Sequence, residues 1–150
     1  MTLRIVSPLN APTLLPTIIY YYGGCFVSGG FATHDNQLRQ LAYYGQCRVI
    51  AVQYRLAPEH TFPAAHDDAQ RGAELVRQHA ERLGVDKQRI TLAGDSAGGH
   101  LALVTALRLK RAGEWQPAQL ILIYPMLDAT AHFEATYAMV TITSSHATLY

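Results

Sequence analysis

Four short apolar runs divide the chain, and amphipathic stretches separate them. The runs are rich in β-branched and aromatic residues, and polar residues do not alternate through them. This pattern is typical of strands buried on both faces of a parallel sheet. The predicted strands cover residues 17–22, 49–54, 90–93 and 120–124.

Apolar residues recur at helical spacing in the stretches between these runs. Thr33 is expected to cap a helix that ends at Gly45, and further helices are predicted over residues 65–83 and 97–112. Gly84 is a plausible stop for the second helix. Strands that alternate with helices predict right-handed crossovers and helices on both faces of the sheet.

The predicted fold class is therefore α/β, with a parallel sheet of about four strands flanked by helices. Both ends of the chain lack this pattern. Residues 1–16 contain three prolines and are expected to be irregular, and residues 126–150 carry no clear period and are expected to be irregular or β-prone.

Composition narrows the class of protein. The 150 residues, 49% hydrophobic and 15% charged, suit one globular domain. A net charge of +1 gives no reason to expect a nucleic-acid partner. Cys25 and Cys47 lie in no metal-binding motif, which favours reduced thiols and a cytoplasmic location. No signal peptide or run of about 18 apolar residues is evident, so no membrane span is expected.

The stretch Gly94-Asp95-Ser96-Ala97-Gly98 follows the third predicted strand and opens the third predicted helix. This G-x-S-x-G spacing fits a nucleophile elbow, a strained strand-to-helix turn that presents a serine hydroxyl. Glycines flank the serine because a Cβ atom would collide where strand and helix approach closely. Ser96 is therefore the candidate nucleophile, and Asp95 is expected to make structural hydrogen bonds beside it.

A glycine-rich loop, residues 23–30, follows the first predicted strand. Ligands of parallel sheets bind at the carboxyl ends of the strands, so this loop and Ser96 are expected at the same edge. Backbone N–H groups that stabilise an oxyanion must approach the substrate closely, which favours glycines. The candidate donors are Gly23, Gly24 and Ala97. No phosphate-binding motif is present in the loop.

Four stretches, in this order, resemble the hormone-sensitive-lipase-like family of α/β-hydrolase esterases (α/β hydrolase fold-3), over roughly residues 17–128. The resemblance implies the central part of an α/β-hydrolase fold, a serine carboxylesterase acting on small-molecule esters, and no cofactor or metal. Tyr22, Cys25 and Asp95 would border its substrate pocket. The matching stretches are Tyr22-Gly23-Gly24-Cys25, residues 54–59 with 62–65, residues 94–99, and Tyr124-Pro125 with Asp128.

The sequence departs from this family in two ways. Tyr22 replaces the histidine of the family's His-Gly-Gly-Gly motif and Cys25 replaces its third glycine, so substrate preference is expected to differ. The acid and the histidine of the family's triad come later than residue 150. Residues 1–150 are therefore expected to form a partial hydrolase domain, without the cap and the C-terminal triad segment.

Two readings of function follow. In the first, the chain is an ester hydrolase; the histidines after Ser96, which are His100, His132 and His146, and the acids Asp128 and Glu134 are weak candidates for its base and acid. In the alternative, the chain is a catalytically incompetent fragment that acts at most as a binding module. In either case, exposed sheet edges favour self-association.

Overall fold

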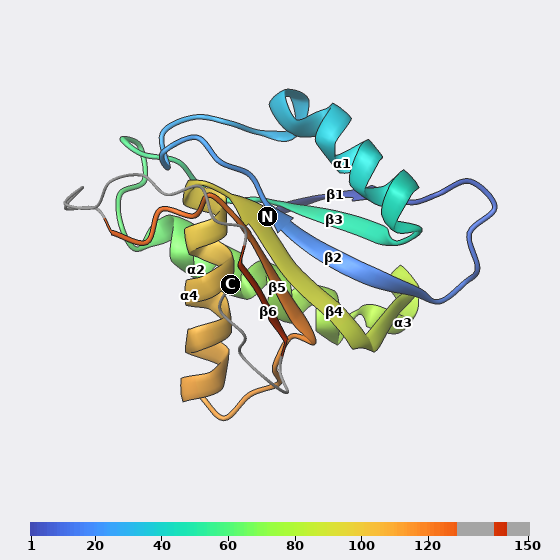
Figure 1. Ribbon diagram of the computed structural model, residues 1–150. Coiled ribbons are helices and arrows are strands. Elements are labelled where there is room, and N and C mark those ends of the chain that lie inside the picture. Colours follow the sequence, from blue (N-terminus) through green and yellow to red (C-terminus); the bar gives the residue numbers. More distant parts are fainter. Residues whose placement is uncertain (129–139, 144–150) are drawn as a thin grey trace.

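The computed structural model describes residues 1–128 and the backbone of residues 140–143. A six-stranded sheet with the order β1-β3-β2-β4-β5-β6 lies at its centre (Figure 1). The four central strands are parallel, as predicted, and the two edge strands β1 and β6 pair antiparallel to their neighbours. The strands are β1 (Thr2–Val6), β2 (Leu15–Tyr21), β3 (Arg48–Gln53), β4 (Val85–Asp95), β5 (Gln119–Ile123) and β6 (Val140–Thr143).

Helices cover both faces of this sheet, which confirms the α/β class. Helix α1 lies on one face, and α2 and α4 lie on the other (Figure 1). The helices are α1 (Phe31–Gly45), α2 (Ala64–Gln78), α3 (Ala80–Leu83) and α4 (Ala97–Arg111). None of the helices in the described residues is long and apolar enough to cross a membrane.

Three sequence predictions need correction. Residues 1–16 are not all irregular, because they hold edge strand β1 and the start of β2. The helix predicted over residues 65–83 is interrupted at His79 and continues as the short α3. Thr33 does not cap α1 from outside: it is the third residue of the helix, and its hydroxyl accepts a hydrogen bond from the Gly30 N–H.

Successive tyrosines on β2 show how the central strands are buried on both sides. Side chains alternate between the two faces of a strand. The Tyr20 hydroxyl therefore accepts a hydrogen bond from Gln37 of α1, while the Tyr21 hydroxyl donates to the Ala69 carbonyl of α2. Both tyrosines are fully buried.

The strand register places the two predicted site segments together. Tyr21 at the end of β2 pairs with Gly94 near the end of β4. The loop over residues 23–30 and the turn at Ser96 therefore leave the same edge of the sheet from neighbouring strands, as the sequence predicted.

Candidate active site

Ser96 occupies a backbone conformation that L-residues rarely adopt, with φ 51° and ψ −118°. The close approach of strand and helix explains the flanking glycines. A Cβ atom on Gly94 would lie 2.4 Å from the Gly98 carbonyl, and one on Gly98 would lie 1.9 Å from the Tyr21 carbonyl oxygen. The Ser96 residue remains partly exposed between buried neighbours. The strained turn predicted from G-x-S-x-G is therefore present, and the role of Ser96 as nucleophile stays a prediction.

Strand β5 and the residues after it hold the backbone of Ser96 on both sides. The Ser96 N–H donates to the Ile123 carbonyl at 2.9 Å, and the Ser96 carbonyl accepts from the Met126 N–H at 3.1 Å. The Ser96 carbonyl also accepts the first helical hydrogen bond of α4, from the His100 N–H. Three backbone hydrogen bonds therefore fix the turn.

The loop over residues 23–30, which we call the glycine loop, has a second run of positive φ angles. Gly24 has φ 134°, and the non-glycine residues Cys25 and Phe26 have φ 54° and 63°. The Gly24 carbonyl accepts hydrogen bonds from the N–H groups of Val27 and Ser28, which closes a tight turn. The thiol-bearing Cys25 is exposed, where the resembling family has a glycine.

Asp95 connects the glycine loop to the turn at Ser96. Its buried carboxylate accepts a hydrogen bond from the Tyr20 hydroxyl at 2.7 Å and another from the Gly23 N–H at 3.0 Å. His34 Nε2 lies 3.4 Å from the second carboxylate oxygen. Burial and then the Asp95 carboxylate raise the pKa of Tyr20 far above its usual value, so this phenol stays a donor. Asp95 is a structural hydrogen-bond acceptor, as expected.

The Gly23 amide is not oriented as an oxyanion donor, contrary to the prediction from the sequence. Its N–H is bonded to Asp95 Oδ1, so it is not free to meet an oxyanion. A Cβ at residue 23 would lie 2.4 Å from Asp95 Oδ2, which explains why a glycine stands there. Within the described part of the chain, no hydrogen bond is found from the amides of Gly24, Cys25 or Ala97.

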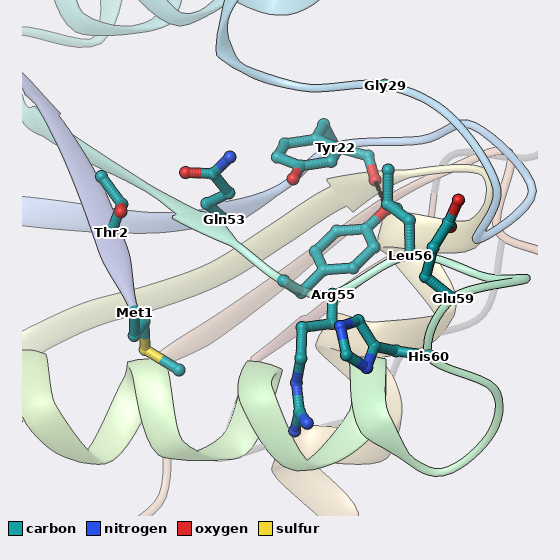
Figure 2. Close-up of a pocket in the computed structure, with 10 residues that line it drawn as sticks. Met1, Thr2, Tyr22, Gly29, Gln53, Arg55, Leu56, Glu59 and His60 are labelled. Carbon is teal, nitrogen blue, oxygen red and sulfur yellow. Dashed lines mark hydrogen bonds between the residues drawn. The ribbon is translucent and has the colours of Figure 1, made fainter.

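A cavity of about 450 Å³ lies beside the glycine loop, on the side of β3 and the start of β1 (Figure 2). Tyr22 lines it, as does Gly29, whereas Ser96, Cys25 and Asp95 do not. Of the three residues expected to border a pocket, only Tyr22 therefore does so here. Its ring stacks on Tyr54 at 4.6 Å, and the Tyr54 hydroxyl donates to the Tyr22 carbonyl at 2.6 Å.

Charged residues of the loop after β3 also line this cavity. Glu59 and His60 are exposed there. Arg55 is not paired with Glu59 but forms two side-chain hydrogen bonds with Asp68, at 2.8 and 3.0 Å. This ion pair ties the loop to α2.

None of the candidate bases that the structure describes contacts the Ser96 hydroxyl. His100 is held instead by the Met126 carbonyl through Nδ1 and by His66 through Nε2. Asp128 is described and has an interaction partner. His132, Glu134 and His146 lie outside the described residues.

His66 is a residue of this region that sequence reasoning missed. It lies 30 positions before Ser96 on a different helix, and no motif marks it. The only signal was a polar ring on the apolar side of a predicted helix. The described residues contain no group of three or more side chains that could bind a metal ion together.

The family described as alpha/beta hydrolase fold matches residues 18–149 of this chain. The chain is 44% identical to "Esterase LipI" of Mycobacterium tuberculosis over 112 residues. This match covers 73% of this chain and 35% of that protein. It is 40% identical to "Ethyl acetate hydrolase" of Pseudomonas putida over 125 residues. This match covers 82% of this chain and 39% of that protein.

Solved structures show the same likeness. A hyperthermophilic esterase from the archaeon Pyrobaculum calidifontis matches with a TM-score of 0.83 and 45% identity, over 87% of this chain and 42% of that one. An ester-hydrolase from the metagenome of Lake Arreo matches with a TM-score of 0.85 and 46% identity, over 87% and 42% of the two chains. The chain thus spans 35% to 39% of the two curated relatives named above.

Proposed function

Because the chain belongs to the alpha/beta hydrolase fold family, we propose that it carries the nucleophile and the oxyanion-binding amides of a carboxylic-ester hydrolase. The observation that carries the proposal is the backbone of Ser96. A non-glycine residue with φ 51°, partly exposed at the carboxyl end of a central strand, has a conformation that costs free energy. Such strain is concentrated at functional sites, and here it presents a hydroxyl.

In the proposed reaction, Ser96 Oγ attacks the ester carbonyl carbon and forms a covalent acyl-serine through a tetrahedral intermediate. The Ala97 N–H opens helix α4, where backbone donors have no intrahelical acceptor. Since Asp95 engages the Gly23 N–H, the glycine-loop donors are Gly24 and Cys25 rather than Gly23 and Gly24. A general base takes the Ser96 proton and gives it to the leaving alcohol. The same base then takes a proton from water, which attacks the acyl-serine, and returns it to Ser96 Oγ as the acid is released.

The proton of Ser96 must pass to a general base. His34 and His100 are each bonded to other groups, Asp95 and Met126 respectively, so neither is assigned this role. Triad members can be removed while oxyanion stabilisation and substrate binding remain, and these alone retain part of the catalysis. A reactive probe that needs no turnover is therefore a sharper test than ester hydrolysis.

The relatives' names guide the choice of substrate. One is called an ethyl acetate hydrolase and others acetyl esterases. We propose esters of short-chain acids and small alcohols for this site. Cys25 has a side chain where the family that this sequence resembles has a glycine, and we expect this side chain to disfavour bulky acyl groups.

The test is covalent labelling of the whole chain with a fluorophosphonate, followed by peptide mass spectrometry. Wild type should be labelled at Ser96, Ser96→Ala should not be labelled, and Ser7→Ala should be labelled like wild type. Hydrolysis of p-nitrophenyl acetate is measured in parallel. Equal labelling of wild type and Ser96→Ala would refute the proposal. Absence of labelling in a folded chain would favour the incompetent-fragment reading.

Self-association and cytoplasmic location stay predictions. The outer edge of β1, at the end of the sheet order, is an unpaired row of backbone groups within the described residues. Light scattering at rising protein concentration tests the first prediction, since a constant monomer mass would contradict it. Cell fractionation tests the second.

A further inference from the structure

Two histidines face each other beneath the glycine loop. His66 near the start of α2 and His100 in the first turn of α4 bring their Nε2 atoms within 3.1 Å. The rings are 5.2 Å apart between centroids and nearly perpendicular, at 87°. We call these two residues the histidine pair. They join two helices that cover the same face of the sheet.

The hydrogen-bond partners determine which nitrogen carries each proton. A carbonyl oxygen only accepts, so the 2.9 Å contact with Met126 requires a proton on His100 Nδ1. In a neutral ring, His100 Nε2 is then an acceptor, and His66 Nε2–H must be the donor. His66 Nδ1 is consequently unprotonated, and it is buried with no hydrogen-bond partner in the described residues.

An added proton has no acceptor within this arrangement. If it binds His66 Nδ1, a charged N–H group is buried without a partner. If it binds His100 Nε2, two N–H groups face each other unless the His66 proton moves to Nδ1, which leaves the same unpaired donor. In either case His100 Nδ1–H still donates to Met126, but a charged N–H group is left buried without a partner. Only the neutral histidine pair therefore fits this arrangement without that cost.

Apolar side chains also enclose the His66 ring and keep it from water. The aromatic ring of Phe26 stacks on His66 at 5.6 Å, and the Phe62 ring lies at 5.1 Å. Burial lowers the pKa of His66 below its ordinary value of 6.5, and His100 and Arg108 lower it further, while Asp67 acts in the opposite direction. Arg108 and Asp67 are themselves paired at 2.8 Å, which moderates both effects.

The histidine pair is connected to the serine turn through one residue. Met126 accepts the hydrogen bond of His100 through its carbonyl and donates through its N–H to the Ser96 carbonyl, at 3.1 Å. The chain after β5 is thus held against the turn by side chain and backbone together. A change at His100 is transmitted to the segment that fixes the strained serine.

We propose that His66 and His100 are positioning residues: the hydrogen bond between their Nε2 atoms orients the His100 ring so that its Nδ1–H holds Met126 against Ser96. An added proton finds no partner in this buried arrangement, which disfavours the packing that orients His100 and makes the geometry of the serine turn sensitive to acid. The proposal rests on the proposed function for its catalytic meaning. The structural part stands without it, because the hydrogen bonds and their loss can be measured in a chain that hydrolyses nothing.

The first test uses the unaltered chain, labelled with ¹⁵N-histidine and treated with a chelator. Long-range ¹H–¹⁵N NMR spectra across pH 8 to 5 report protonation and tautomer of each ring. We expect His100 as the Nδ1–H form and His66 as the Nε2–H form, with His66 titrating below its ordinary pKa of 6.5. The opposite tautomers, or a His66 that titrates at or above pH 6.5, would overturn the proposal.

The second test measures hydrogen exchange at the Met126 amide at neutral pH. In His100→Ala, which removes the donor to Met126, we expect exchange to accelerate roughly tenfold, the factor that corresponds to one net hydrogen bond. His100→Asn retains a side-chain N–H group and should restore most of the protection. If both variants match wild type, His100 does not hold Met126.

The third test compares thermal unfolding across pH. A native pKa below 6.5 means that the unfolded chain binds more protons, so stability is complete above pH 6.5 and falls as the pH decreases below it. His66→Phe keeps an aromatic ring against Phe26 and removes the titration, so its pH dependence should be shallower. His60→Asn is the matched control and should keep the wild-type slope.

If labelling of Ser96 fails while these three results appear, the proposed function is wrong and the histidine pair stands. If labelling succeeds, its rate should fall below pH 6.5 more steeply in wild type than in His66→Phe. Equal pH profiles of labelling in the two proteins would overturn the positioning role.

Discussion

The turn at Ser96 and the glycine loop leave neighbouring strands at one edge of the sheet, and both contain non-glycine residues with positive φ. They are held in different ways. The turn is surrounded by backbone: the atoms nearest to added Cβ atoms at Gly94 and Gly98 are main-chain atoms of β2 and α4. The glycine loop is held to the turn largely through one carboxylate, that of Asp95.

This contrast indicates which atoms determine each conformation. Backbone atoms cannot rotate away, so the serine turn tolerates no added side chain at its glycines. A carboxylate can be replaced by another acceptor, so the glycine loop should tolerate conservative change at the residue that holds it. Substitutions in the two regions should therefore separate into severe and graded effects.

The largest effect is expected from Gly98→Ala. Its Cβ would lie 1.9 Å from the Tyr21 carbonyl oxygen, and β2 and α4 would have to separate. We expect a loss of about 3 kcal/mol or more in the free energy of unfolding, measured by urea denaturation. Gly30→Ala is the matched control, since nothing lies within 4 Å of its Cβ, and it should cost under about 1 kcal/mol. Similar losses in both variants would show that backbone contact does not determine the turn.

An intermediate effect is expected from Asp95→Ala. The buried Gly23 N–H would lose its acceptor, and Tyr20 would lose one of its two partners. We expect about 3 kcal/mol of destabilisation and faster hydrogen exchange at the Gly23 amide. Asp95→Asn keeps an acceptor oxygen and should recover at least half of the loss. A Gly23 exchange rate that is the same in all three proteins would contradict the assigned hydrogen bond.

The smallest effect is expected from Cys25→Gly. A left-handed conformation costs an L-residue roughly 1–2 kcal/mol, and glycine avoids this cost but has more conformational entropy when unfolded. With φ 54° at Cys25, the net change should be a gain of up to about 1 kcal/mol. Cys25→Ala keeps the Cβ and should show no gain. Denaturation midpoints of the two variants measure the difference, and equal midpoints would mean that the loop relaxes around the side chain.

The apolar runs predicted the four central strands because each carries its own signal. Successive residues are buried in parts of β2, β3 and β4, and β5 keeps an apolar run although Ile121 and Ile123 are only partly buried. Edge strand β1 was not predicted because it is partly exposed and carries no continuous apolar run. Its pairing with β3 depends on residues about 50 positions away. The break at His79 is likewise invisible in a pattern whose apolar positions continue into α3.

The parts of the site formed by neighbouring residues in the sequence could be predicted. The spacing around Ser96 encodes its own strained turn, so G-x-S-x-G sufficed for the conformation. The orientation of the Gly23 amide depends on Asp95, 72 positions later, and the histidine pair joins positions 34 apart. Such contacts are formed by the sheet order and the packing of α2 on α4, which no single stretch of sequence contains.

The sheet order also dictates when the serine turn can form during synthesis. Gly94, Ser96 and Gly98 are all translated before β5, yet the Ser96 N–H finds its acceptor only at Ile123. A nascent chain that stops short of β5 holds the motif but lacks that acceptor. Such a chain has only the His100 hydrogen bond of the three that fix the turn, so we expect a reagent specific for the strained serine to prefer chains that extend through Met126.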